Sequence, residues 1–305
     1  MGFFRRLAGP KSAHATGVFP AASSSTATTE HDVLSLVSVS KPAWGYGLET
    51  VPGVLPPKAG RGRRIAFAQL ATPGLPDLAA RLARPEDDLG RLARGLPLWL
   101  AETLYFSSNY EPIAVVGSLN KSRHALFAEP WSDQHLRQLV DTAADGLDYV
   151  VAGELTDGGR TLVLRLFDAA KARERKAWTL GWTPETADRT LAGFHEHFRL
   201  FMEWDGPATH GLAYVPPARP AAWIQTLGAS LSLFLAEKNA LSADQLVLPP
   251  AVLDLAAEHA VTGEAASLGW LTLQARALKQ GLLPAPVNVQ LYPSPLVQTA
   301  QAALG

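Results

Sequence analysis

The feature that most constrains the fold of this chain of 305 residues is a turn signal between two apolar runs near its middle. Residues 149–155 (YVVAGEL) and 161–167 (TLVLRLF) flank residues 157–159, which read Asp-Gly-Gly. Glycine adopts positive φ angles at low cost, so this turn chemistry between two apolar runs is typical of a β-hairpin. Residues 176–182 alternate apolar and polar side chains and predict a third antiparallel strand. The middle of the chain therefore predicts a sheet.

Upstream of the hairpin, the apolar pattern predicts two further strands and two helices. Residues 65–70 and 112–117 are short apolar runs bounded by breakers, as in buried strands. Residues 87–107 carry leucines at three- and four-residue spacing, which predicts a helix, and Pro97 is expected to kink it or to start a new one. A second helix is expected over residues 132–144, capped by its leading Ser or Asp.

Beyond the third strand the pattern becomes helical. Residues 183–185 (Thr-Pro-Glu) have the cap and proline chemistry of a helix start. Helix pairs joined by short connections, as the rest of the chain predicts, resemble degenerate TPR-type pairs, although the period of about 34 residues of such repeats is not readable. The four predicted helices span residues 221–237, 250–260, 263–280 and 294–304.

The order of predicted elements over residues 64–182 resembles the amino-terminal domain of TolB and its relatives, which also precede TPR repeats in bacterial cyclase and regulator proteins. This resemblance implies a mixed sheet with helices that is used for protein contacts, and it supplies no catalytic residues. The chain departs from TolB in having no signal peptide and no evident β-propeller repeats, so a periplasmic translocation role is not implied. The matching residues are 64–67 (RIAF), 95–104 (GLPLWLAETL), 144–155 (ADGLDYVVAGEL), 158–162 (GGRTL), 166–169 (LFDA) and Trp178.

The predicted fold class is therefore α+β: a mixed sheet with helices, followed by an all-helical region. We expect an extended arm or linker over residues 1–62, a TolB-like α/β domain over 63–205 and a helical, TPR-like domain over 218–305. The arm carries Trp44 and Tyr46 between glycines and prolines, and such a segment cannot form a core alone. Either it lies on its own domain or it is inserted into a neighbouring subunit.

The composition excludes several classes of function. The chain has no cysteine, which rules out disulfides, thiolate metal sites, iron–sulfur clusters and cysteine nucleophiles. A net charge of −1 indicates no general attraction to nucleic acid or to anionic lipid. No run of about 18 residues is free of charges and of Pro or Gly breaks, so no integral membrane segment is expected. Without an apolar signal segment near the N-terminus, the expected location is the cytoplasm.

The sequence contains no complete match to a common catalytic or metal-binding motif. Residues 195–197 (His-Glu-His) fall on a predicted helix, where histidines two apart point in different directions, so a solvated face is favoured over a metal site. The acidic residues 86–88 favour helix initiation, because negative charge is stabilised at a helix N-terminus. Residues 60–64 are interpreted as a polar hinge, since they lack the context of a phosphate-binding loop. No Gly-x-Ser-x-Gly occurs either. We expect no catalytic residue, no cofactor and no metal.

Three segments are candidates for contact with a partner. The basic run over residues 171–176 fits a solvated hairpin tip or a partner-facing patch. Aromatic and Arg side chains dominate binding hot spots, and they are concentrated near the N-terminus and in the arm. The predicted partner-binding residues are Phe3, Phe4, Arg5, Arg6, Trp44 and Tyr46.

The leading functional hypothesis is a non-enzymatic structural or adaptor subunit of a bacterial multiprotein assembly, homo- or hetero-oligomeric. It would bind protein partners through the N-terminal arm and the helical region. The first alternative is a regulatory or sensory module whose helical region grips a peptide, which a concave surface lined by Trp223 and Trp270 would favour. The second is an enzyme with an unrecognised site, which a deep pocket of Asp, Glu or His with shifted pKa values would indicate.

Overall fold

A mixed β-sheet organises the computed structural model, which describes residues 16–19, 33–58, 62–205 and 211–304. Within these ranges the sheet contains eight strands in the order β1-β2-β4-β3-β6-β7-β8, with β5 paired to the end of β4. The strands are β1 (Thr16–Phe19), β2 (Leu34–Val39), β3 (Arg63–Ala68), β4 (Tyr110–Leu119), β5 (Arg123–His124), β6 (Tyr149–Thr156), β7 (Thr161–Asp168) and β8 (Arg173–Gly181).

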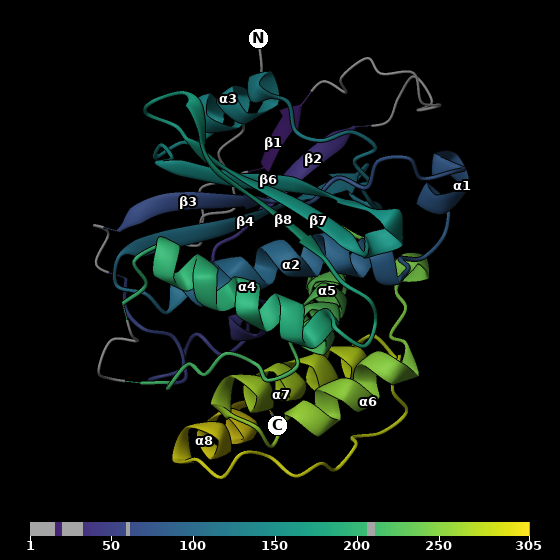
Figure 1. Cartoon of the computed structure of the whole chain (residues 1–305). Helices are drawn as coiled ribbons and strands as arrows, with labels where there is room; N and C mark the ends of the chain where they lie inside the picture. Colours follow the sequence, from purple (N-terminus) through teal and green to yellow (C-terminus); the bar gives the residue numbers. More distant parts are fainter. Residues whose placement is uncertain (1–15, 20–32, 59–61, 206–210, 305) are drawn as a thin grey trace.

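Helices cover both faces of this sheet. Figure 1 shows α2 between the sheet and α5, with α3 on the opposite side of the sheet. The helices are α1 (Leu78–Leu82), α2 (Asp88–Tyr105), α3 (Asp133–Thr142), α4 (Ala187–Phe201), α5 (Pro220–Glu237), α6 (Pro250–His259), α7 (Glu264–Lys279) and α8 (Pro295–Leu304). Three short 3-10 turns are η1 (Ala43–Gly45), η2 (Asp157–Gly159) and η3 (Ala243–Gln245).

The sheet combines a parallel centre with antiparallel flanks. β3 is parallel to both β4 and β6, whereas β2 with β4, β6 with β7 and β7 with β8 are antiparallel. The hairpin predicted around residues 157–159 is confirmed as β6–η2–β7, with φ of 62° at Gly158 and 87° at Gly159. An α+β architecture of sheet plus helices is thus confirmed at the coarse level.

Local capping signals place the helices close to where the sequence predicts them. Ser132 caps α3 by accepting a hydrogen bond from the backbone N–H of His135 at 3.2 Å. Pro97 lies inside α2 without ending it. One start was predicted wrongly: α4 begins at Ala187 rather than at residues 183–185, because those residues form a turn closed by hydrogen bonds between Thr183 and Thr186.

The predicted arm is partly a sheet strand. Residues 34–39 form β2, whose antiparallel register along β4 pairs Leu36 with Gly117. The apolar residues of this segment were visible in the sequence, but the strand with which they pair was not. Beyond β2 the chain crosses the helical side of the molecule, where Trp44 is fully buried and Tyr46 is 8% exposed.

One continuous hydrophobic core runs through all three predicted parts. It includes Val39 from the predicted arm, Phe67 from the sheet and Ala300 from the last helix. Helices α2 and α5 approach each other closely: a Cβ built on Gly95 would lie 2.1 Å from the backbone oxygen of Ile224. The boundaries after residue 62 and around residues 205–218 remain predictions, and extensive packing crosses both of them.

Candidate functional site

The candidate site is a crevice at the carboxyl ends of the parallel strands β3 and β4. The connection from β3 leads through α2 on one face of the sheet, and the connection from β4 leads through α3 on the other face. Where neighbouring parallel strands send their connections to opposite faces, their carboxyl ends leave a crevice that commonly binds ligands. Here the crevice has a volume of about 340 Å³.

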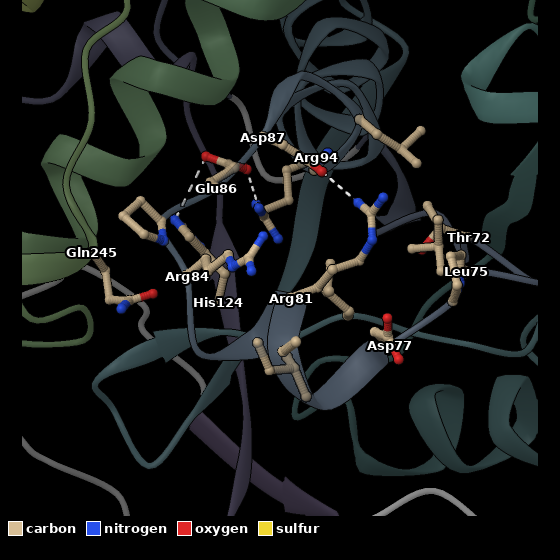
Figure 2. A pocket seen from close by; sticks show the side chains of 17 residues that line it. Thr72, Leu75, Asp77, Arg81, Arg84, Glu86, Asp87, Arg94, His124 and Gln245 are labelled. Atoms are coloured by element: carbon tan, nitrogen blue, oxygen red, sulfur yellow. Dashed lines mark hydrogen bonds and ion pairs between the residues drawn. The ribbon is translucent and has the colours of Figure 1, made fainter.

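Several separate segments line the crevice. They are the segment after β3 with Thr72, helix α1 and the turn after it, the first turn of α2, His124 on β5 and Gln245 in η3. Figure 2 shows these side chains around one space. Because α2 is 18 residues long and begins here, its positive dipole end faces the crevice.

A buried ion pair forms the wall beside α2. The Arg94 guanidinium donates through Nη2 to Glu86 Oε1 and through Nη1 to the carbonyl oxygen of Ala125 at 3.2 Å. The side chains of Arg94 and Glu86 are 1% and 4% exposed. Ser232 of α5 donates to the other carboxylate oxygen of Glu86 at 2.9 Å. This pair therefore joins the turn before α2 to the helical part of the chain.

Gly90 makes room for this ion pair. A Cβ at position 90 would lie 2.9 Å from Nη2 of Arg94 and 3.0 Å from Cγ of Glu86. The backbone N–H of Gly90 in turn donates to the carboxylate of Asp87, which caps α2, at 2.8 Å. The acidic residues 86–88 thus have two roles: Asp87 and Asp88 lie at the helix start as predicted, whereas Glu86 turns inward to Arg94.

His124 lies on the same wall and is neutral near pH 7. Burial, reinforced by the Arg94 charge, lowers its pKa well below the ordinary 6.5. Its Nε2 lies 3.0 Å from Oγ of Ser232, and its Nδ1 has no partner in the described chain. Since the Ser232 hydroxyl donates to Glu86 and no described acid holds Nδ1 of His124, the described part of this cluster is not arranged as a serine–histidine–acid relay.

Unused hydrogen-bonding capacity surrounds the crevice. Thr72 Oγ1, Arg94 Nε and His124 Nδ1 are buried atoms without a partner among the described residues, and all three residues line the crevice. Most buried polar groups in proteins are hydrogen-bonded, and leaving one unpaired costs about 1–3 kcal/mol. A concentration of such atoms around one crevice indicates a place where polar groups meet something other than the protein itself.

The arginines at the crevice differ in what they contact. Arg81 of α1 pairs with Asp87, and Arg94 pairs with Glu86. Arg84, in the turn between α1 and α2, is exposed, and its side chain has no ion-pair or hydrogen-bond partner within the described ranges. Figure 2 shows Arg84 among the lining side chains. Among the arginines that the structure describes at the crevice, Arg84 is therefore the one that remains available to a ligand.

A second polar cluster lies deeper, between α2 and α5. Glu102 of α2 accepts hydrogen bonds from the indole N–H groups of Trp44 at 2.8 Å and of Trp223 at 3.0 Å. Burial raises the pKa of Glu102 to about 7, against the opposing effect of these bonds. With His259 it lines a cavity of about 90 Å³, whose small size and two occupied carboxylate oxygens favour a structural role.

The predicted partner-binding residues do not come together on a described surface. Phe3, Phe4, Arg5 and Arg6 lie outside the described residues. Trp44 is buried against its own chain, and Tyr46 stacks on Phe234 at a ring separation of 4.3 Å. Residues 33–58 therefore follow the first of the two interpretations of the arm, in which the arm lies on its own domain. In that position the rings of Trp44 and Tyr46 present no surface to a partner.

The solvated helix face predicted for residues 195–197 is only partly correct. Glu196 and His197 are exposed, but His195 is 3% exposed and stacks on Trp99 with ring centroids 4.6 Å apart. Its Nε2 lies 2.7 Å from the hydroxyl of Thr103. Burial lowers the pKa of His195 to about 3. The prediction failed because phenylalanines mark the buried face of α4, and His195 borders that face.

No family model, no curated protein and no solved structure matches this chain. The resemblance to TolB-type and TPR-type domains therefore stays a prediction. Within the described ranges, no helix is long and apolar enough to cross a bilayer. The same part of the chain holds no group of three or more His, Asp or Glu side chains placed to bind a metal.

Little in the sequence pointed to the crevice. Glu86 and Arg94 are eight positions apart, so only their place around a helix start hinted at a contact. His124 and Ser232 are separated by 108 positions, and no local pattern links them. The one sequence feature that could have located the crevice is a general rule. Polar residues that follow two parallel strands and precede a long helix lie at the same edge of the sheet.

Proposed function

We propose that this protein is a non-catalytic regulatory module that binds a small ligand carrying a carboxylate or phosphate group in the crevice. The observation that carries the proposal is the position of the crevice at the carboxyl ends of β3 and β4, where their connections diverge. Arg84 without a protein partner and the N-terminus of α2 supply positive potential there. Thr72 adds a hydroxyl without a partner.

The crevice also supports a regulatory role through its walls. Glu86 in the turn before α2 accepts a hydrogen bond from Ser232 of α5, and Gln245 of η3 lines the same space. A ligand held there touches both the sheet side and the helical side of the molecule. Binding is therefore expected to stabilise the contact between α2 and α5, which is how occupancy would be passed to the helical region.

Thermal unfolding titrated with inorganic phosphate, and separately with succinate, tests this proposal at constant ionic strength. A ligand that binds the folded state raises the melting temperature in a saturable way. We expect Arg84→Ala to abolish this rise, and Arg137→Ala, an exposed arginine on α3, to preserve it. Equal melting temperatures with and without both anions, or a rise that survives Arg84→Ala, would overturn the proposal.

A structural or adaptor function in a multiprotein assembly is the second candidate. One observation favours it: β8 lies at the end of the sheet with most of its side chains exposed. Such an edge offers backbone groups to a partner chain. The predicted TolB-like and TPR-like character of the chain suits this function as well. Loss of assembly on removing residues 1–15, which precede β1 so that β2 and the buried Trp44 stay in place, tests the contribution of the N-terminal segment when it is measured by native mass spectrometry.

A further inference from the structure

The edge strand β8 leaves one side without a strand neighbour. Within the described residues it pairs only with β7, and seven of its nine residues are exposed. An edge strand presents unpaired N–H and C=O groups that accept a strand from another chain. A register shift opposite Leu166 and Phe167 interrupts the first part of β8. The regular part of the edge is residues 176–181.

An apolar groove runs between this regular edge and α4. It has a volume of about 610 Å³ and is lined by residues of β8 and α4 alone within the described chain. Trp178 of β8 packs edge-on against Phe194 and Phe201 of α4, with ring centroids 6.0 and 5.4 Å apart. A Cβ on Gly193 of α4 would meet no atom within 4 Å, so the groove is free of protein atoms above this residue.

The charges that line the groove are of one sign. Lys176 on β8 and Arg189 on α4 line it, together with His197, and among the described residues no Asp or Glu does. Both Lys176 and Arg189 are exposed, and within the described chain neither side chain has an ion-pair or hydrogen-bond partner. Lysines on an edge strand also discourage aggregation. Protection of the edge strand against aggregation does not, however, require an aromatic groove beside it.

We propose that an extended acidic segment of a protein partner adds to β8 as a further strand. Its backbone pairs with residues 176–181, its apolar side chains enter the groove beside Trp178, and its carboxylates meet Lys176 and Arg189. This inference rests on the second candidate function and names its partner class. Among the described residues, none lines both this groove and the crevice. Experiments on the strand-docking surface and on the anion site therefore give independent results.

Fluorescence polarisation with a labelled peptide of the pattern Val-Thr-Glu-Thr-Val-Thr-Glu, which places valine and glutamate on the one strand face that meets the groove, tests the inference on the full chain. We expect this peptide to bind, and a matched peptide with lysine in place of glutamate not to bind. Binding should weaken with added salt, because exposed charge pairs are screened. Gly193→Leu fills the groove on a helix position with open space, and it should weaken binding by about tenfold or more.

Charge-reversal variants distinguish binding in the groove from general electrostatic attraction between the peptide and the protein. Lys176→Glu and Arg189→Glu should each weaken binding by about tenfold, and Arg137→Glu on the other face of the sheet should not. A peptide with alternate backbone amides methylated should lose binding if it pairs with β8. Absence of binding, affinity unchanged by Gly193→Leu, or equal binding of the methylated peptide would overturn the inference.

Discussion

The carboxylate of Glu102, in the last turn of α2, accepts a hydrogen bond from the indole N–H of Trp44, 58 positions earlier in the chain. The second carboxylate oxygen accepts from Trp223 of α5 at 3.0 Å. One buried acid thus connects the segment after β2, the central helix and the helical region. This contact explains why the predicted arm packs on its own chain, and it leads to the first two predictions.

Replacing Glu102 with glutamine is expected to change how stability depends on pH. Burial raises the pKa of Glu102 from its ordinary 4.5 to about 7, so between these values the folded state holds a proton that the unfolded state releases. The unfolding free energy therefore falls as pH rises through this window, by about 3 kcal/mol in total. Glu102→Gln has no proton to release. Urea unfolding at several pH values should show that the difference in unfolding free energy between Glu102→Gln and wild type changes between pH 4.5 and 7. Parallel plots of unfolding free energy against pH would contradict the prediction.

Replacing Trp44 with alanine should destabilise the folded chain strongly. The ring is fully buried and its N–H is bonded to Glu102, so the change leaves a cavity and an unpaired carboxylate oxygen. We expect a loss of about 3–5 kcal/mol in chemical denaturation. Tyr292→Ala, at a position that is 39% exposed, should cost less than about 1 kcal/mol. A Trp44→Ala protein of unchanged stability but altered oligomeric state would instead indicate an arm shared between subunits.

Replacing Gly95 with alanine should separate α2 from α5. The added Cβ would lie 2.1 Å from the backbone oxygen of Ile224, and a backbone atom cannot move aside by changing rotamer. We expect a loss of at least about 2 kcal/mol, despite the better helix propensity of alanine. Gly193→Ala on α4 is the matched control, because its Cβ meets no atom within 4 Å. That control should stabilise the protein by up to about 1 kcal/mol, and similar values for both variants would refute the close-packing argument.

The ring of His195 should remain neutral throughout the mildly acidic range. Burial lowers its pKa from the ordinary 6.5 to about 3, so the unfolded chain binds a proton here below pH 6.5 while the folded chain does not. This group therefore contributes stability above pH 6.5 that is lost as pH falls toward 3. The imidazole resonances of His195, assigned with His195→Gln, should keep their chemical shifts between pH 8 and 5. A titration midpoint inside that interval would show that the ring is accessible to solvent.

Much of the local structure was predictable because it depends on neighbours within a few residues. The glycines of 157–159 specify the hairpin through positive φ angles, and Ser132 specifies the start of α3 through its cap. Leucine spacing located α2 for the same reason. The late start of α4 shows the limit of such rules, since Thr183 and Thr186 closed a turn where the cap pattern suggested a helix.

Turn chemistry, caps and apolar spacing act locally, so the sequence predicted strands at β3, β4, β6, β7 and β8, most of the helices and the coarse α+β class, but not β1, β2, β5 or α1. Tertiary packing sets the pairing of β2 with β4, the contact of Trp44 with Glu102, and the meeting of Glu86, Arg94 and His124 at the crevice, where Ser232 bonds to Glu86. These relationships join residues up to 146 positions apart. They depend on strand register and on which helix faces can be buried together, and neither is written in any short stretch of the chain.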